Sequence, residues 1–254
     1  MRVLSDNHMH TEYSSDGRGH AVGSIRDIVE SARNVGLREI IISDHGPGHS
    51  LYGIKRKKLK EIRNEIDILN EEYDDINILM GMESNVMSYR GIIDLDFDEI
   101  QMLDRLSVGF HYGIIPKDLR TFFIFLVLNP ISKVFKPLKK YVIKESTDAL
   151  IKIVEDYPID IITHPGSKVE LDIERLSRVC ELHGTALEIN SHHSRLDIDS
   201  IKLAMKSEVK FSFGSDAHRP GRVGDLDNAV KRAIECKLPK DRIINIIDTK
   251  EKEH

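Results

Sequence analysis

Short apolar runs alternate along the chain with longer amphipathic segments, and this alternation predicts the fold. The runs are rich in β-branched and aromatic residues, as buried strands are. We expect strands at residues 3–4, 39–42, 76–80, 106–108, 159–162, 186–189 and 210–213. The amphipathic segments have the spacing of helices that bury one face. We expect helices at residues 24–34, 57–72, 145–156, 172–182, 197–206 and 225–236.

Strands that alternate with helices are typical of parallel βαβ units. About seven such units in 254 residues predict a closed α/β barrel of the TIM type, formed by a single domain over residues 1–254. An open doubly wound sheet is the alternative, but no glycine-rich dinucleotide fingerprint follows any expected strand.

Ionisable residues follow nearly every expected strand. The motifs are D-N-H-M-H at 6–10, S-D-H at 43–45, G-M-E-S at 81–84, G-F-H at 109–111, T-H-P-G at 163–166, E-I-N-S at 188–191 and G-S-D-A-H at 214–218. In parallel barrels the active site lies at the carboxyl ends of the strands. The sequence therefore predicts that these side chains converge at one mouth of the barrel.

Imidazole and carboxylate groups are the ligands that Zn, Mn and Fe take from proteins. His8 and His10 lie two residues apart, so on an extended strand both point the same way and can hold one ion. Asp216 and His218 repeat this spacing, and Glu83 offers a bridging carboxylate. One H-x-H pair is weak evidence, but the repetition at successive strand ends predicts a site for several metal ions.

Composition narrows the alternatives. The net charge is −5, from 37 Lys and Arg against 42 Asp and Glu, which argues against nucleic acid as the main partner. Two cysteines, Cys180 and Cys236, cannot build a disulfide framework or a thiolate metal site. Residues 1–10 lack the apolar core of a signal peptide. The longest apolar run, 122–128, is far shorter than the roughly 20 residues that span a bilayer. We therefore expect a cytoplasmic protein.

The ordered motifs resemble the PHP (polymerase and histidinol phosphatase) superfamily over almost the whole chain. Residues 44–48, 109–111, 164–166 and 187–190 resemble its YcdX-like phosphatase branch in particular. The resemblance implies a distorted (β/α)7 barrel, a cluster of three divalent metal ions and hydrolysis of phosphoesters. The expected substrate is a small phosphorylated metabolite, and the expected ions are Zn, Mn or Fe.

The resemblance also implies a ligand set. Eight positions match by motif: His8, His10, His45, Glu83, His111, His164, Asp216 and His218. A ninth ligand belongs in the loop that precedes the first long helix. Asp16 fits when residues are counted forward from His10, and His20 fits when they are counted back from Ser24. Both stay open here, with a slight preference for His20.

The expected reaction is in-line attack on phosphorus by a metal-activated hydroxide. We expect Asp6 to orient a ligand histidine. Arginines bind phosphate through paired N–H donors, and Arg195 is preferred over Arg56 and Arg219 because it closely follows a strand-end motif. His193 is the expected hydrogen-bond donor to substrate.

Residues 112–144 are the least regular segment, and we treat them as an insertion. Their apolar and lysine-rich stretches fit a helix pair packed on the barrel or a lid over the active site. An oligomer interface and a basic membrane-surface helix are the further alternatives. For the whole protein, two other functions stay open: a PHP-type nuclease acting on DNA ends, and a metal-stabilised regulatory domain without activity.

Overall fold

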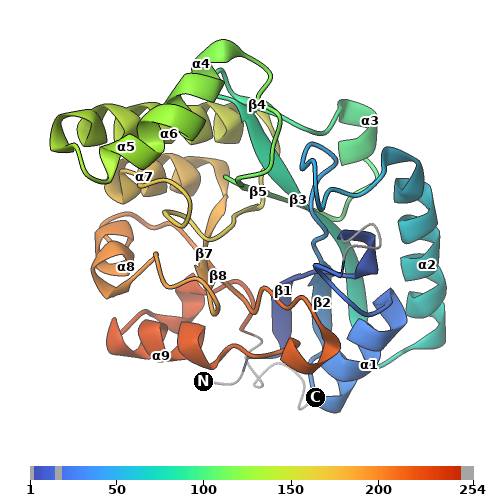
Figure 1. The fold of residues 1–254 in the computed structure, drawn as a ribbon. Helices are drawn as coiled ribbons and strands as arrows, with labels where there is room; N and C mark the ends of the chain where they lie inside the picture. Colours follow the sequence, from blue (N-terminus) through green and yellow to red (C-terminus); the bar gives the residue numbers. More distant parts are fainter. Residues whose placement is uncertain (1–2, 15–18, 247–254) are drawn as a thin grey trace.

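A computed structural model describes residues 3–14 and 19–246. Seven parallel strands form a ring with helices on its outside (Figure 1). Their order in the sheet is β1-β2-β3-β5-β6-β7-β8. The strands are β1 (Ser5–Met9), β2 (Glu39–Ile42), β3 (Asn77–Ser88), β5 (Arg105–Gly109), β6 (Ile161–Ile162), β7 (Ala186–Asn190) and β8 (Phe211–Gly214). The predicted parallel α/β barrel is confirmed.

The ring closes only at the carboxyl ends of its first and last strands. Met9 pairs with Ala217 in a parallel bridge beyond β8. The amide of His10 donates to the carbonyl of Ala217 at 2.8 Å, and the amide of Asp216 donates to the carbonyl of His8 at 2.9 Å. Backbone hydrogen bonds therefore join the two chain segments that carry the first and last sequence motifs.

Helices cover the outside of the ring. They are α1 (Ile25–Asn34), α2 (Leu59–Glu72), α3 (Phe97–Ile100), α6 (Lys136–Asp156), α7 (Ile173–His183), α8 (Ile198–Ala204) and α9 (Asp227–Glu235). Ser24 and Asp27 form a capping box that starts α1. Asp172 caps α7, and Gly184 ends it in the left-handed conformation at φ 73°. Four 3-10 turns lie between these elements: Glu12–Ser14, Arg56–Lys58, Pro220–Arg222 and Lys240–Arg242.

Inside the ring, apolar side chains form one layer and the polar side chains of the site form another. Ile41 of β2, Ile161 of β6 and Ala186 of β7 contact one another in a small buried cluster. Strands that do not pair with each other can meet in this way only across the barrel interior. Side chains two residues further along a strand point the same way, so Glu188, two residues beyond Ala186, lies above this apolar plug. The plug thus forms the base on which the site is built.

Three elements differ from the predictions. The first strand covers residues 5–9 rather than 3–4, because its polar side chains are buried and so belong to the barrel. β3 continues to Ser88 and pairs there with an unpredicted antiparallel strand, β4 (Ile92–Ile93). The helix expected at 145–156 begins at Lys136.

The insertion is helical. It contains α4 (Leu119–Thr121), a π-helical stretch (Phe122–Leu128) and α5 (Asn129–Ser132), and it leads directly into α6. These elements pack on the outside of the ring beside α6 and α7 (Figure 1). Among the described residues, none of the helices is long and apolar enough to cross a membrane.

Candidate metal centre

The carboxyl ends of the strands surround a cavity of about 670 Å³. The predicted ligands that line it are His20, His45, Glu83, His111, His164, Asp216 and His218. His8 and His10 are buried, and the His10 Nε2 atom lies 3.3 Å from Asp216 Oδ1. The structure therefore brings together every predicted ligand within the described residues. Asp16 lies outside those residues.

The Glu83 carboxylate lies at the centre of this group. Its Oε1 atom is 2.9 Å from His164 Nε2 and 3.1 Å from His111 Nε2, and its Oε2 atom is 2.9 Å from His45 Nδ1. Among the described residues, both oxygens are buried and accept no well-directed hydrogen bond, and His45 Nδ1 takes part in none. Burying a carboxylate that accepts no hydrogen bond is costly, so these atoms fit a cation held between the carboxylate and the imidazoles.

Three pairs of histidine rings face each other through their Nε2 atoms. The separations are 3.1 Å for His8 and His10, 3.2 Å for His111 and His164, and 3.0 Å for His218 and His20. Two imidazole nitrogens bound to one tetrahedral Zn at about 2.0–2.1 Å lie roughly 3.3 Å apart. The spacing of each pair therefore fits two ligands of a shared ion.

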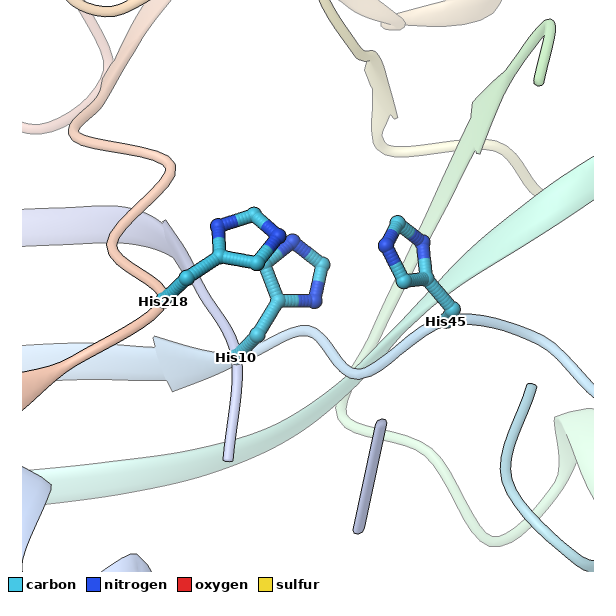
Figure 2. Close-up of side chains that lie close together, drawn as sticks. All are labelled: His10, His45 and His218. Atoms are coloured by element: carbon cyan, nitrogen blue, oxygen red, sulfur yellow. The ribbon is translucent and has the colours of Figure 1, made fainter. Parts of the chain in front are cut away.

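Donor atoms gather in three overlapping groups. His10, His45 and His218 form one, His8, His10 and Asp216 a second, and His45, Glu83 and His111 a third. Figure 2 shows the first group, in which three rings from separate segments point toward the same space. Asp216 and His218 fall in different groups, although His218 Nδ1 lies 3.5 Å from Asp216 Oδ1.

Four of the rings are hydrogen-bonded from behind through Nδ1. His8 Nδ1 lies 2.7 Å from Glu188 Oε1, and His111 Nδ1 lies 2.9 Å from Asn85 Oδ1. The other two bonds are His10 Nδ1 to Ser14 Oγ at 3.4 Å and His218 Nδ1 to the Asp216 carbonyl at 2.9 Å. Such bonds fix the orientation of a metal-binding imidazole and leave Nε2 for the ion.

Burial and charge set the protonation states that ligands need. Burial lowers the pKa of His111 to about 4 in spite of the neighbouring Glu83. Burial alone would raise the pKa of Glu83, but His111 and His8 hold it well below its usual range. Burial likewise opposes ionisation of Asp216, and His8 and His10 lower its pKa well below normal. Neutral imidazole and ionised carboxylate are the forms that bind metal.

Two of the candidate ligands have strained backbones. His164 has φ 29° and Asp216 has φ 55°, in the left-handed region that side-chain-bearing residues rarely occupy. Strain of this kind is typical of residues held in place for function. The backbone at Gly214 is closely surrounded by the site. A Cβ atom at this position would clash with Glu188 Oε1 and would lie 2.7 Å from the His8 Cβ atom.

The expected role of Asp6 needs correction, and Glu188 was missed as a site residue. Asp6 accepts hydrogen bonds from the backbone amides of Ser215 at 3.0 Å and Gly224 at 2.9 Å. It also accepts a longer bond, 3.4 Å, from the backbone amide of His8. Asp6 therefore joins β1 to the loop after β8, and among the described residues its hydrogen bond to a ligand histidine reaches the backbone rather than an imidazole ring. Glu188 orients the His8 ring instead, and its other oxygen accepts from the His164 amide at 2.5 Å. The sequence could have indicated Glu188, because it lies two residues before Asn190 in the same strand, and side chains at this spacing share one face.

The predicted substrate contacts divide between two cavities. His193 lines the main cavity, with Nε2 3.6 Å from Asp216 Oδ2, and Asn190 Oδ1 accepts from its backbone amide at 2.7 Å. Arg195 is exposed and lines a smaller neighbouring cavity of about 250 Å³.

Other cations line the main cavity: Lys168, Arg219 and Arg222. Arg56 bonds to Glu99 and to the Asp94 carbonyl and does not line it. Of the three arginines that the sequence suggested, Arg219 therefore lines the main cavity, whereas Arg56 and Arg195 do not. Lys168 and Arg222 were not predicted there.

The chain is similar to known proteins over most of its length. Residues 6–192 match the model of the PHP domain. The chain is 28% identical over 259 residues to a probable phosphatase of Shewanella piezotolerans, covering 96% of this chain and 90% of that protein. It is 28% identical over 255 residues to the probable phosphatase YcdX of Escherichia fergusonii, covering 95% and 89%.

A solved structure shares the fold. The histidinol phosphate phosphatase of Lactococcus lactis, determined with zinc, L-histidinol and phosphate, superposes with a TM-score of 0.60. The two chains are 18% identical, and the match covers 92% of each. At this identity the superposition supports the barrel fold alone. The assignment of the site residues rests on the distances and burial described above.

Proposed function

Because the chain belongs to the PHP domain family, we propose that it is a metal-dependent phosphoesterase that hydrolyses a small phosphomonoester. The observation that carries this proposal is the buried Glu83 carboxylate, which accepts no well-directed hydrogen bond from the described residues and is surrounded by imidazole nitrogens. The relatives named above as probable phosphatases support the reaction class. The free, buried cysteines support the cytoplasm as the compartment.

Three divalent ions, of Zn, Mn or Fe, would be held by the three donor groups around Glu83. His10 and His45 each belong to two of these groups, which favours ions close enough to share neighbouring ligands. When bound, such ions lower the pKa of water toward neutrality and neutralise phosphoryl oxygens during in-line displacement at phosphorus. His20 would supply the loop ligand, because its Nε2 atom already faces that of His218 at 3.0 Å.

The chain's own residues bind and orient the substrate. Lys168, Arg219 and Arg222 give the mouth a positive potential that attracts an anionic ester. His193 can donate a hydrogen bond to a phosphoryl or leaving-group oxygen, since burial and the nearby His164 lower its pKa to about 4 and keep the ring neutral. Arg195 lies outside the main cavity, so Lys168 and Arg219 replace it as the expected anion contacts.

The test is phosphate release from a panel of phosphomonoesters by protein stripped with a chelator and reloaded with Mn, Zn or Fe. We expect metal-dependent release from p-nitrophenyl phosphate, and we expect Glu83→Gln to reduce kcat/KM at least 1,000-fold. The Glu83→Gln protein should also bind less metal by elemental analysis. His183→Ala is the control, because His183 is an exposed histidine at the end of α7.

Three outcomes would contradict the proposal. Full activity in Glu83→Gln would remove the carboxylate from the reaction. Degradation of single-stranded DNA without release from any monoester would favour the nuclease alternative instead. Absence of both activities in fully metal-loaded protein would favour a regulatory domain.

A further inference from the structure

The insertion differs from the rest of the chain in charge. Residues 112–144 contain six lysines and one arginine but a single aspartate, a net charge of +6. The whole chain has a net charge of −5, so the remainder carries −11. A charge contrast of this size within one chain indicates a partner that is negatively charged and is met by the insertion alone.

The same segment exposes its large apolar side chains. The exposed fraction is 86% for Val134, 54% for Phe123, 52% for Phe135, and 43% each for Phe122 and Ile131. These exposed side chains belong to consecutive elements: Phe122 and Phe123 lie in the π-helical stretch, Ile131 lies in α5, and Val134 and Phe135 follow its end. The exposed apolar side chains are therefore grouped in one segment rather than scattered over the chain.

Exposed lysines lie close to these side chains in the sequence. Lys133 lies between Ile131 and Val134 and also lines the cavity of about 250 Å³ beside Arg195, Lys136 follows Phe135, and Lys140 lies one helical turn further along α6. None of these three lysines forms an ion pair with a described residue. We call Phe122, Phe123, Ile131, Lys133, Val134, Phe135, Lys136 and Lys140 the basic aromatic face.

The opposite side of the insertion already anchors it to the barrel. Phe125 is fully buried and stacks on Tyr112, with ring centroids 5.0 Å apart. Asn129 Nδ2 donates to the Lys168 carbonyl at 3.0 Å and to the Tyr112 hydroxyl at 3.0 Å. Packing of the insertion is thus achieved without the exposed residues. The helices lie at the edge of the molecule and away from the strand ring (Figure 1), so their outer side is open to a partner.

We propose that the basic aromatic face binds the surface of an anionic bilayer. Its Phe and Val side chains would enter the boundary between headgroups and acyl chains, and its lysines would contact acidic headgroups. Apolar residues beside lysines are the composition of segments that lie in the membrane interface. Each lysine near an anionic surface strengthens binding by about fivefold, so three give roughly 100-fold.

Charge favours a bilayer over a second copy of the chain. A two-fold dimer through this face would place the same positive patch on both sides of the contact. In a head-to-tail contact, the lysines of one copy would meet the negatively charged remainder of a second copy. That contact would, however, place Phe123 and Val134 against a polar surface. An anionic bilayer matches both the charge and the apolar side chains.

The experiment is sedimentation of the full chain with vesicles of phosphatidylcholine alone or with 30% phosphatidylglycerol. We expect binding to the anionic vesicles only, falling steeply between 50 and 300 mM salt. The variant Lys133→Gln, Lys136→Gln, Lys140→Gln should bind roughly 100-fold more weakly. The control Lys57→Gln, Lys60→Gln, Lys231→Gln removes the same charge from exposed positions on other helices or turns and should bind within twofold of wild type.

Val134→Ser tests the apolar part, because at 86% exposure it has little effect on folding. It should weaken vesicle binding about tenfold, and Val134→Leu should retain binding. Phosphatase activity toward p-nitrophenyl phosphate and circular dichroism check that each variant is folded. No binding to anionic vesicles would overturn the proposal. Light scattering that shows a dimer which Val134→Ser dissociates would also overturn it, in favour of an interface between copies.

Discussion

The metal centre and the insertion depart from ordinary globular packing in opposite ways. At the centre, Glu83 and the imidazoles of His8 and His10 are polar groups buried inside the barrel. In the insertion, Val134 and Phe135 are apolar groups left in water. Both arrangements cost free energy in the isolated chain. Each therefore indicates a partner outside the polypeptide, a cation in the first case and a bilayer surface in the second.

The two regions also differ in how they are held. The rings at the centre are fixed through hydrogen bonds to their rear nitrogens, from residues such as Glu188 and Asn85. In the insertion, the exposed rings of Phe122 and Phe123 pack edge to face, with centroids 5.6 Å apart. A site that selects ions by geometry needs the first kind of support, whereas a surface that meets fluid lipid does not.

The largest expected effect is acid destabilisation of the metal-free protein. Burial holds the pKa of His111 at about 4, and burial also lowers the pKa of His20 to about 4. In the unfolded chain both titrate near 6.5 and bind more protons. Stability should therefore be complete above about pH 6.5 and fall as the pH drops toward 4, by on the order of 3 kcal/mol for the fully buried His111 alone.

His49 and His193, whose pKa burial lowers to about 4, add to this slope. Asp6 and Asp44 oppose it, because burial raises the pKa of each carboxyl. Glu188 and Glu83 raise the pKa of His8 against the effect of burial, so its contribution is present below pH 6.5 and is lost only at higher pH. Urea unfolding of chelated protein between pH 4.5 and 7.5 measures the effect. A flat profile would show that the imidazoles are not buried as described, and His111→Gln should reduce the slope whereas His183→Ala should not.

The next effect concerns Glu188, which bonds the rear of the His8 ring at 2.7 Å. Glu188→Gln keeps the shape but weakens this bond, and changes of this type typically cost 10–100-fold in metal affinity or activity. Competition with a chromogenic chelator measures the affinity. Asp6→Asn is the comparison, because Asp6 bonds only backbone amides. Equal loss of metal affinity in both variants would mean that Glu188 acts through folding rather than through His8.

The regular parts of the barrel could be predicted from the sequence because their side chains are apolar, as expected of buried strands. Residues 39–42 and 186–189 are apolar runs and were placed within one residue of β2 and β7. β1 was misplaced because Asp6 and His8 resemble loop residues, and only the barrel interior makes them strand residues. Strand-end motifs brought the ligands together, since parallel strands end at one mouth.

What the sequence could not provide was contact across the chain. Asp6 meets the amide of Ser215, 209 residues away, and no spacing rule reports such a partner. Arg195 follows a strand-end motif, as His193 does, yet the two line different cavities. The direction of a loop after its motif depends on packing against neighbouring loops. Local pattern therefore predicts which residues reach the mouth of the barrel better than it predicts which face the substrate.

The smallest effect should come from the insertion and would confirm the contrast between the two regions. Val134 is 86% exposed, so Val134→Ser should change the free energy of unfolding by less than about 0.5 kcal/mol. Phe125, fully buried nine residues earlier, is the matched comparison, and Phe125→Ala should cost about 3–5 kcal/mol. Urea unfolding at pH 7.5 measures both. A loss above 1 kcal/mol in Val134→Ser would show that this side chain stabilises the fold, and its exposure would then no longer indicate a partner.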